Sequence, residues 1–388
     1  MVERVFSDIA VIGSGIIGLS TALACAQAGA NVAIVTKDSS RPPTAPEAMV
    51  SALNARSWSF LESLGVVDVL EETATHYIQM QVRTTIDQGI DWHAFDTHRK
   101  RLGFVVNNQS MLSSLWGALQ RYKSRVKWYT FAPTSWQGSH LLGPGIEIRP
   151  QALLGCDGVH SWLRTECSIQ ATTSAYKDTA VSGVITHSEA HGGCARQVFL
   201  PCGILGLLPT SSPYRSIYIF SYPQENDKES KESVVYEAVA KNFVDLGKVT
   251  VEKIQTKQVI QGHHVHHYTQ GRATLLGDAA LRLHPMAGLG LNCGLQSVAS
   301  YTQAWRHAYC TGHSHPERYA AEQYTKDCRG YNHLTYRGIE MLRCYSQGTG
   351  AQTSLYWAFG IAQRYPWIAR RCIEHALHGV WIGEKEYG

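Results

Sequence analysis

The chain has 388 residues, of which 44% are hydrophobic and 17% are charged, an ordinary balance for a globular protein and unlike that of a disordered one. This length exceeds the usual span of one domain and predicts two packed domains. A net charge of +4 is too small to indicate a nucleic-acid-binding protein, for which a clustered basic face would be expected.

The ten cysteines are scattered and form no CxxC pair, so we expect reduced thiols that serve as small apolar side chains. The first residues lack the pattern of a secretory signal. No run of about 20 apolar residues is free of charge, so no membrane-spanning helix is expected. These features predict a cytoplasmic protein, either soluble or held peripherally at the inner membrane.

The first predicted elements form a Rossmann-type unit. A buried strand at 8–12 leads into the turn GSGIIG, then a helix and a second buried strand at 31–36. Gly13, Gly15 and Gly18 occupy the G-x-G-x-x-G positions, which allow a tight turn, close approach of a pyrophosphate and close helix packing. The helix start offers unpaired N–H groups to phosphates. The order of elements predicts a noncovalent dinucleotide site at this turn; the alternative is a tight turn in an unrelated α/β protein.

The acidic residue that usually ends the second strand and binds the adenosine ribose is absent. Thr36 stands at this position, followed by Lys37 and Asp38. Thr36 can still form one hydrogen bond to the ribose, whereas Asp38 could substitute only if the loop curls inward.

The next predicted elements are taken from hydrophobic periodicity and turn residues. They are a loop at 41–46, a helix over 51–72, β structure at 77–92, a helix at 110–122, β structure over 176–268 with one helix at 234–246, a strand and glycine turn at 272–280, and helix from about 290 onward.

Rossmann-like segments therefore recur, with β-rich segments between them. This order predicts a discontinuous cofactor domain with an inserted second domain. The predicted FAD-binding domain comprises 1–75, 103–172 and 270–330, the substrate domain 76–102 and 173–269, and the C-terminal helices 331–388.

Two later motifs also follow predicted strands. In LLGCDGVHSWLR, Asp157 lies at the carboxyl edge of a strand and Gly158 opens the turn; alone, this would be an ordinary Asp-Gly turn. In ATLLGDAALRLHPMAGLGLNCG, Asp278 ends a strand and could bind a ribityl hydroxyl. A helix beginning near Gly290 would direct its N–H groups at the flavin edge that becomes negative on reduction.

Together these motifs resemble the group A flavoprotein monooxygenases, which have the p-hydroxybenzoate hydroxylase fold, and most closely the ubiquinone-biosynthesis hydroxylases of the UbiH and UbiF type. The resemblance also rests on SALNARSWSFLESLGV at 51–66, LGFVVNNQSMLSSL at 102–115, YKDTA at 176–180 and FLPCGILGLLP at 199–209. It implies an α/β fold: a Rossmann-type FAD-binding domain with an inserted β-rich α+β substrate domain and a C-terminal helical segment.

The activity implied by this resemblance is hydroxylation of the aromatic ring of a polyprenyl phenol in ubiquinone biosynthesis. FAD is the implied cofactor, NAD(P)H the transient reductant and O2 the oxidant. Peripheral contact with a membrane through the C-terminal helices and with ubiquinone-pathway proteins is implied as well. No metal is implied, and no catalytic residue can be named, because the cofactor carries the hard chemistry.

The resemblance assigns roles to several groups of residues. The pyrophosphate is assigned to Gly13, Gly15 and Gly18, the ribityl chain to Asp278, and the isoalloxazine to Pro285, Gly288, Gly290, Leu291 and Asn292. Asn108 is a candidate flavin contact, and Asp157 and Gly158 have a structural role near the cofactor with a candidate nicotinamide contact. The predicted cofactor-binding set also includes Ile16, Thr36, Lys37 and Gly277.

Several positions depart from the family pattern. They are Thr36 and Ser297 in place of acids, Met49 in place of an arginine, Asn107 in place of a glutamate, Leu281 in place of a histidine and Leu289 in place of a glutamine. Two alternatives therefore stay open. One is a non-catalytic or FAD-weakened paralogue that acts as a binding or scaffold protein in the same pathway, and the other is a different flavin oxidoreductase on the same fold.

Three remaining features have two readings each. HHVHH at 263–267 could supply metal ligands, but a polar strand is the favoured reading. The apolar run at 199–209 could line a pocket for an apolar substrate or form a buried strand. The aromatic stretch that contains Arg364, Arg370 and Arg371 suits either an interfacial helix on an anionic membrane or a docking helix.

Overall fold

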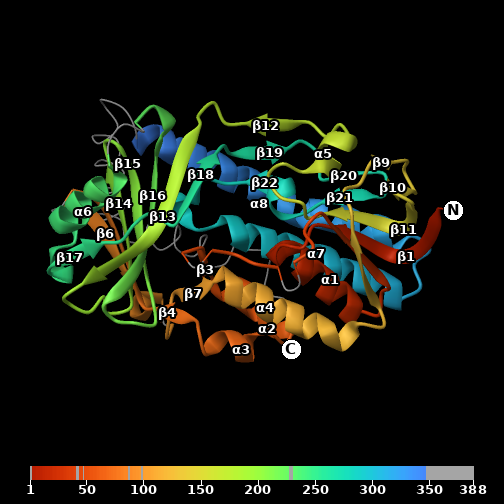
Figure 1. Cartoon of the computed structure of the whole chain (residues 1–388), viewed down its shortest axis with the longest axis horizontal. Helices are drawn as coiled ribbons and strands as arrows, with labels where there is room; N and C mark the ends of the chain where they lie inside the picture. Colours follow the sequence, from red (N-terminus) through yellow and green to blue (C-terminus); the bar gives the residue numbers. More distant parts are fainter. Residues whose placement is uncertain are drawn as a thin grey trace.

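The computed structural model describes residues 2–40, 43–46, 48–85, 88–97, 99–226 and 230–346. Two large sheets lie toward opposite ends of its long axis, with helix α7 (Gly290–Cys310) between them (Figure 1). The long helix α8 (Pro316–Ser346) packs along α7. The fold is the expected α/β arrangement of a Rossmann-type unit and a second, β-rich unit.

The first sheet has the order β20-β21-β11-β1-β2-β8, and β21, β11, β1, β2 and β8 are mutually parallel neighbours. Its main strands read as continuous apolar runs because helices cover both faces of such sheets. The strands are β1 (Glu3–Ile12), β2 (Val32–Thr36), β8 (Val126–Thr130), β11 (Ile146–Gly155), β20 (Thr269–Gln270) and β21 (Ala273–Leu275), extended by β9 (Ser135–Trp136) and β10 (Leu141–Gly143).

Helices α1 (Ile16–Gln27), α4 (Asn108–Leu119) and α7 contribute side chains to the same apolar core as this sheet. Neighbouring strands in the sheet come from distant parts of the sequence, since β1 pairs with β2 on one side and with β11 on the other. The discontinuous domain boundaries predicted from sequence stay a prediction; α8 continues without a break across residue 330.

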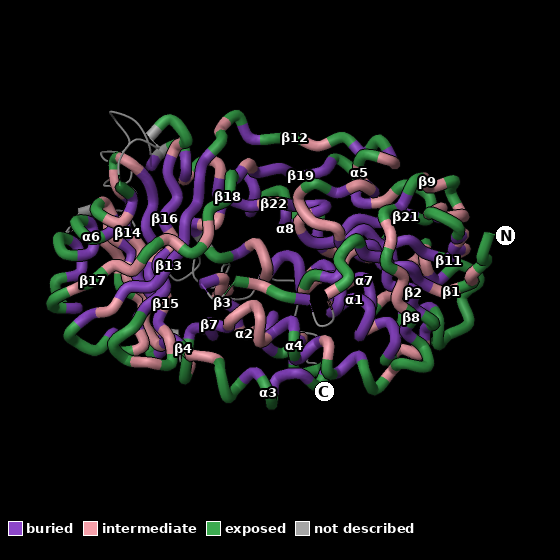
Figure 2. Tube along the Cα trace, viewed as in Figure 1, coloured by how far each residue is buried: buried purple, intermediate pink, exposed green. Residues whose placement is uncertain are grey.

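The second sheet is largely antiparallel and has the order β17-β13-β16-β15-β14-β5-β6, with β18 also paired to β13. Its strands are β5 (Gln79–Thr85), β6 (Gln88–His93), β13 (Asp178–His187), β14 (Cys194–Leu200), β15 (Gly203–Pro209), β16 (Arg215–Pro223), β17 (Val249–Val251) and β18 (Thr256–Ile260). Helix α6 (Lys231–Asn242) shares an apolar cluster with one face of this sheet. Figure 2 shows that the inner strands of both large sheets are buried.

Smaller elements complete the described part of the chain. One three-stranded sheet joins β3 (Val50–Leu53), β7 (Gly103–Asn107) and β4 (Thr75–Tyr77), and another joins β12 (Ala171–Thr173), β19 (His263–Val265) and β22 (Leu281–Arg282). The remaining helices are α2 (Ala55–Ser63), α3 (Val67–Glu71) and α5 (Trp162–Glu166), with 3-10 turns η1 (Ala94–Thr97), η2 (Gln120–Tyr122), η3 (Gln224–Asn226), η4 (Val244–Leu246), η5 (Gly277–Ala279) and η6 (Pro285–Ala287).

The helix predicted over 51–72 is wrong at its start. Residues 51–53 belong to strand β3, which pairs antiparallel with β7. The helix begins only after Asn54, whose side chain accepts a hydrogen bond from the backbone N–H of Ser57 at 2.9 Å. This N-cap provides the start signal, because an Asn that caps a helix has extended backbone and separates it from what precedes.

The structure describes only part of the region predicted to form C-terminal helices, 331–388. Helix α8 covers the start of the predicted C-terminal helices, whereas residues 347–388, including the aromatic stretch, lie outside the described residues. Within the residues that are described, no helix combines the length and the apolar character needed to cross a bilayer.

Candidate functional site

A cavity of about 700 Å³ lies where the Rossmann-type unit meets the second sheet. Its lining comes from two sides. The turn before α1, strand β3, turn η6 and the start of α7 form one side, and strands β5, β6, β13, β14, β15, β16 and β18 form the other. Its size is within the range of cofactor and small-molecule sites.

The glycine turn after β1 is shaped by close backbone contacts. Gly13 has φ +110°, and a Cβ there would lie 2.3 Å from the carbonyl oxygen of Cys156. A Cβ on Gly18 would lie 2.1 Å from the carbonyl oxygen of Gly13. Gly15 differs, because a Cβ built on it would meet no atom within 4 Å. Gly13 and Gly18 therefore fix the turn, and Gly15 leaves space beside the start of α1.

Two helix N-termini open into the cavity, since Gly15 and Ile16 at the start of α1 and Gly290 and Leu291 at the start of α7 all line it. Neither helix has a side-chain N-cap or an acidic residue in its first turn. Their first N–H groups thus lack capping side chains, and the positive ends of both helix dipoles favour negative charge in the cavity.

The Gly277–Asp278 turn is held from beneath by Ser297. The Ser297 hydroxyl donates to the carbonyl oxygen of Gly294 at 2.6 Å and accepts from the backbone N–H of Gly277 at 3.2 Å. Gly277 has φ +59° and packs against Ile17 of α1. Ser297, which stands where the family has an acidic residue, therefore supports the turn that presents Asp278 to the cavity.

Asp278 has a partner that sequence reasoning missed. Arg282 lines the cavity, forms an ion pair with the Asp278 carboxylate and lies 3.5 Å from the amide oxygen of Gln258. Its only sequence signal is a cation four residues after the Gly-Asp turn. The ion pair offsets part of the negative charge that Asp278 presents to the cavity.

Asp157 is placed behind the glycine turn rather than at the cavity surface. Its Oδ2 accepts from the backbone N–H of Leu163 at 3.2 Å, and its Oδ1 is buried without a hydrogen-bond partner within the described part of the chain. Gly158, with φ +78°, lines the cavity. Arg164 braces this region, because it donates to the carbonyl oxygens of Val159 at 2.7 Å and Ala279 at 2.9 Å.

Thr36 at the end of β2 is 6% exposed and already has two hydrogen-bond partners. Its hydroxyl lies 2.9 Å from the hydroxyl of Ser14 and accepts from the backbone N–H of Asp38 at 3.1 Å. Lys37 is exposed. The end of β2 therefore offers a pair of neutral hydroxyls where the family pattern has a carboxylate.

Asn107 and Asn108 have different roles at the start of α4. Asn107 caps the helix by accepting from the backbone N–H groups of Gln109 and Ser110. Asn108 lines the cavity and accepts a hydrogen bond from the Ser51 hydroxyl at 2.8 Å. The glutamate of the family pattern is thus replaced by asparagine, a preferred N-cap residue.

Asn292 connects α7 to strand β3. Its amide nitrogen donates to the carbonyl oxygens of Ala52 at 2.8 Å and Gly288 at 2.9 Å, and its amide oxygen accepts from the backbone N–H of Asn54 at 2.9 Å. Three other departures are apolar: Leu281 and Leu289 are buried, and Met49 lines the cavity. The apolar replacements leave the turn before α7 intact.

A buried ionic cluster joins η6 to β13 and α8, and sequence reasoning missed it. The fully buried Asp178 accepts from Arg343 Nε at 2.8 Å and Nη2 at 2.6 Å. His284 Nδ1 accepts from the backbone N–H of Met286, so its proton lies on Nε2, which donates to Asp178 at 3.2 Å. The guanidinium of Arg343 stacks over the ring of Tyr176 at 3.6 Å.

Burial raises the pKa of Asp178, but hydrogen bonds from His284 and Arg343 outweigh it and hold the pKa below its ordinary value. The carboxylate is therefore charged at neutral pH and anchors the turn that lines the cavity. An acid within the otherwise apolar segment DTAVSGVI is the sequence signal that could have identified it.

The second sheet forms the apolar wall of the cavity. On β14 and β15, Phe199, Ile204 and Leu208 line the cavity, whereas Leu205 and Leu207 face the core that includes α6. Both readings of the apolar run at 199–209 therefore hold, because alternate residues of a strand point to opposite faces.

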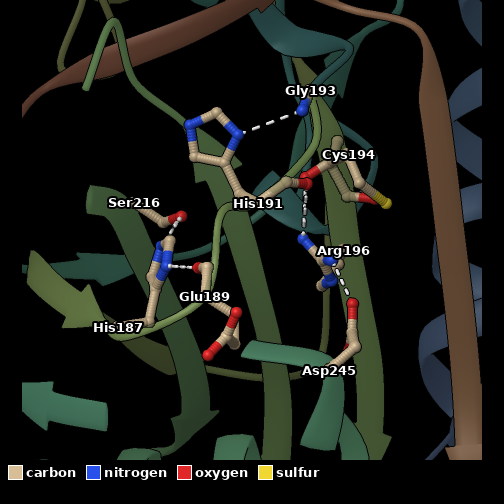
Figure 3. A network of polar contacts seen from close by, with 9 residues as sticks. His187, Glu189, His191, Gly193, Cys194, Arg196, Ser216 and Asp245 are labelled. Carbon is tan, nitrogen blue, oxygen red and sulfur yellow. Dashed lines mark hydrogen bonds and ion pairs between the residues drawn. The ribbon is translucent and has the colours of Figure 1, made fainter. Parts of the chain in front are cut away.

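Arg196 also borders the cavity, but its guanidinium is held by Asp245 of η4 and by the carbonyl oxygens of His191 and Cys194 (Figure 3). Nearby, His187 bonds to the hydroxyl of Ser216 and to the carbonyl oxygen of Glu189. The Nη atoms of Arg196 and both ring nitrogens of His187 thus have partners on the side of the sheet that carries α6.

The histidines of HHVHH have protein partners. His263 donates to the carbonyl oxygen of Asp278 at 2.9 Å, His264 lies 2.9 Å from the hydroxyl of Tyr268, and His266 lies 3.0 Å from the hydroxyl of Thr172. Burial lowers the pKa of both His263 and His264 to about 4. Within the described ranges, no cluster of His, Cys, Asp or Glu suited to a metal ion is found.

The structure brings most of the predicted cofactor residues to one cavity. Those that line it are Gly15, Ile16, Asn108, Gly158, Asp278, Pro285, Gly288, Gly290, Leu291 and Asn292, and those that lie behind or beside it are Gly13, Gly18, Thr36, Lys37, Asp157 and Gly277. The open space at Gly15 and Gly290, at two uncapped helix starts, fits a dinucleotide with a pyrophosphate and a ring system that becomes anionic. The end of β2 supplies no charge to such a ligand, because Thr36 stands there.

Comparisons with known proteins agree with this geometry. The sequence profile of the family described as FAD binding domain matches residues 7–330. The 3-demethoxyubiquinol 3-hydroxylase of Escherichia coli K12 is 27% identical over 322 residues, covering 77% of this chain and 82% of that protein. The mitochondrial ubiquinone biosynthesis monooxygenase COQ6 of Mus musculus is 26% identical, covering 76% and 74%.

A solved structure shares the fold. The p-nitrophenol 4-monooxygenase PnpA from Pseudomonas putida DLL-E4 superimposes with a TM-score of 0.74 at 17% sequence identity, covering 97% of this chain and 99% of that one.

Proposed function

We propose, from the premise that this chain belongs to the FAD binding domain family and is an FAD-dependent monooxygenase, that it hydroxylates the aromatic ring of a polyprenyl phenol. By their names, one of the relatives above is a hydroxylase of 3-demethoxyubiquinol and the other is a monooxygenase of ubiquinone biosynthesis. The substrate proposed here is accordingly a phenolic precursor of a lipid quinone.

The overall reaction consumes one phenol, O2, NAD(P)H and a proton, and yields the hydroxylated ring, water and NAD(P)⁺. One oxygen atom enters the ring and the other leaves as water, and the reductant supplies two electrons. Bound FAD would activate the oxygen. The protein's part is to hold the cofactor, orient the ring and keep bulk water away.

One observation carries this proposal: a single cavity contains both the two uncapped helix starts and the apolar wall of the second sheet. The helix starts suit the charged parts of a dinucleotide, whereas Phe199, Ile204 and Leu208 suit an apolar substrate. A ring bound against that wall would lie in the same cavity as the cofactor, as direct oxygen transfer requires.

The test begins with the protein purified without added cofactor. Its visible absorption spectrum, and the identity of any flavin released on denaturation, report FAD binding. With FAD bound, NADH and NADPH oxidation is followed with short-chain prenyl phenols, and the hydroxylated product is identified by mass spectrometry. Substrate-stimulated oxidation with product formation is expected.

The second candidate function, a non-catalytic paralogue, is favoured by the neutral Thr36 site and the apolar Met49. It predicts a protein that neither carries FAD nor takes it up when FAD is added. That result would contradict the hydroxylase proposal. FAD binding without ring hydroxylation would instead favour a different flavin oxidoreductase.

We propose further that the protein acts peripherally at a membrane, because a polyprenyl tail dissolves in the bilayer. The aromatic C-terminal sequence with Arg364, Arg370 and Arg371 has the composition of an interfacial segment. Cosedimentation with vesicles containing anionic lipid is expected to exceed that with neutral vesicles. Equal recovery in the supernatant with both would contradict this.

A further inference from the structure

The apolar wall of the cavity has a gap at its centre. In the register of the second sheet, Gln197 of β14 lies opposite Gly206 of β15, and Gly206 lies opposite Ile219 of β16. All three residues line the cavity. Their neighbours in the next row, Phe199, Ile204 and Ser221, also line it.

The backbone conformation at position 206 does not require glycine, and the missing side chain leaves open space. A Cβ built there would have the carbonyl oxygens of Arg196 and Ile219 as its nearest neighbours, both at 3.9 Å, and its φ is not in the left-handed region. Glycine in a strand interior weakens the strand and often marks a place where a ligand approaches closely. The missing side chain at Gly206 therefore enlarges the cavity.

Two polar side chains border this gap, Gln197 in the same row as Gly206 and Ser221 in the next row. Neither side chain has a hydrogen-bond partner among the described residues, although Ser221 is only 3% exposed. Other polar residues at the same wall are paired: the Ser182 and Thr256 hydroxyls lie 2.6 Å apart. A polar group left unpaired in an apolar wall is costly unless a ligand or water completes it.

Among the described residues, the sheet offers this ligand no unpaired cation. The guanidinium of Arg196, next to Gln197 in sequence, is bound to Asp245 of η4. Arg196 lies on the same strand face as Val198, which packs in the cluster with α6. An amide and a hydroxyl can each donate or accept, so they match phenol hydroxyl, methoxyl and quinone carbonyl oxygens alike. A ring carboxylate would have no opposite charge in this part of the cavity.

We propose that the ring of an uncharged, oxygen-substituted aromatic substrate binds over Gly206, between Gln197 and Ser221. These strands flank β15 and lie roughly 10 Å apart, a width that a ring and two hydrogen bonds can fill. The side chains of Gln197 and Ser221 thereby select for oxygen substituents on the ring, and the missing side chain at Gly206 provides the space for the ring. This inference rests on the proposed hydroxylase function, whose substrate it specifies.

The experiment measures binding without turnover, by calorimetry on the FAD-loaded protein in the absence of NAD(P)H. The probes are a phenol with one five-carbon prenyl group, the same molecule without its hydroxyl, and the same phenol with a ring carboxylate. The unmodified protein is expected to bind the phenol about tenfold more tightly than the analogue without its hydroxyl, the effect of one completed hydrogen bond. It should also bind the phenol more tightly than the carboxylate, which would be buried without an opposite charge.

The Gln197→Leu and Ser221→Ala double variant should reduce the preference for the hydroxyl to about twofold or less while the affinity for FAD stays unchanged. Gly206→Val should weaken binding of the phenol at least about tenfold and leave the melting temperature equal or higher, because a β-branched residue suits a strand. Gln81→Leu is the matched control, since Gln81 pairs in register with Arg196 and so lies on the opposite face. Gln81→Leu should change neither the affinity for the phenol nor the preference for its hydroxyl.

The outcomes separate this inference from the function beneath it. Tight phenol binding that is unaffected in the double variant and in Gly206→Val overturns the ring site and leaves the hydroxylase proposal standing. A protein that carries FAD but binds none of the three probes overturns both. Equal effects of Gln81→Leu and of the double variant would assign the loss to the sheet rather than to the site, and would also overturn the inference.

Discussion

Single residues of the glycine turn separate folding from cofactor binding. Gly15→Ala introduces a methyl group that meets no protein atom within 4 Å, whereas the methyl of Gly18→Ala would lie 2.1 Å from the carbonyl oxygen of Gly13. We expect Gly15→Ala to fold normally but to bind FAD about tenfold more weakly, because the added group occupies the space at the helix start. We expect Gly18→Ala to lose about 1–3 kcal/mol of stability.

Thermal melts followed by circular dichroism, together with quenching of FAD fluorescence on titration, measure the two effects separately. If Gly15→Ala leaves the FAD affinity unchanged, the pyrophosphate does not bind beside the start of α1. A Gly18→Ala variant as stable as the parent would show that the turn relaxes readily.

The Thr36 position makes a second prediction about a single residue. Thr36→Glu places a carboxylate beside Ser14, where the neutral hydroxyl now bonds to Ser14 and to the backbone of Asp38. We expect FAD affinity to rise about tenfold, because two charge-assisted hydrogen bonds to the ribose replace one neutral bond. The protein without FAD should melt at a lower temperature, since the new carboxylate is buried.

Thr36→Gln is the matched control, with similar size and no charge. Fluorescence titration and melts with and without FAD provide the measurements. If Thr36→Glu and Thr36→Gln bind FAD equally tightly, the ribose does not contact residue 36 at the end of β2.

At the scale of elements, helix α8 is tied to turn η6 through Asp178. Arg343→Leu removes the bidentate partner of a fully buried carboxylate, so we expect a loss of about 3–5 kcal/mol in the free energy of unfolding. Adding Asp178→Asn removes the stranded charge and should recover much of that loss. Urea unfolding at pH 7 measures both, and a double variant less stable than Arg343→Leu alone would contradict this account.

Strand β19 makes the protein sensitive to acid. Burial lowers the pKa of His263 and His264 to about 4, below the ordinary value of about 6.5 for an unfolded chain. The unfolded chain therefore binds more protons between these values, so stability is full above about pH 6.5 and falls as the pH drops toward 4. Each histidine contributes a slope of at most about 1.4 kcal/mol per pH unit.

Urea unfolding measured from pH 7.5 to 4.5 tests this dependence. The His263→Gln and His264→Gln double variant should show a shallower loss of stability over that interval. Identical slopes in the variant and the parent would assign the acid sensitivity to other groups.

The elements that sequence predicts well are those that carry their own local signals. The glycine turn, the strands around it and the helix that begins at Gly290 follow from periodicity and from residues with special backbone preferences. Strand β3, with the sequence VSAL, is too short for its apolar pattern to distinguish a strand from a helix, and only its pairing with β7 decides. The Asp178, His284 and Arg343 cluster joins three distant segments, and no single window of sequence contains it.

At the scale of the whole molecule, the cavity lies between units with separate apolar cores. A ligand that bridges them stabilises both, by about 2.7 kcal/mol when its concentration is 100 times the dissociation constant. We therefore expect saturating FAD to raise the melting temperature in one cooperative transition. Differential scanning calorimetry tests this, and two transitions of which only one shifts would contradict it.

The parallel sheet has a consequence for the order of events during synthesis. Strand β1 at the start of the chain must wait for β11, and β11 must wait for β21 at Ala273–Leu275, before the sheet is complete. At roughly 5–20 residues per second, the ribosome has by then been translating for tens of seconds. The nascent chain exposes unpaired apolar strands throughout that interval, so we expect cofactor capture to follow release of most of the chain and to depend on chaperones that shield β1 and β2.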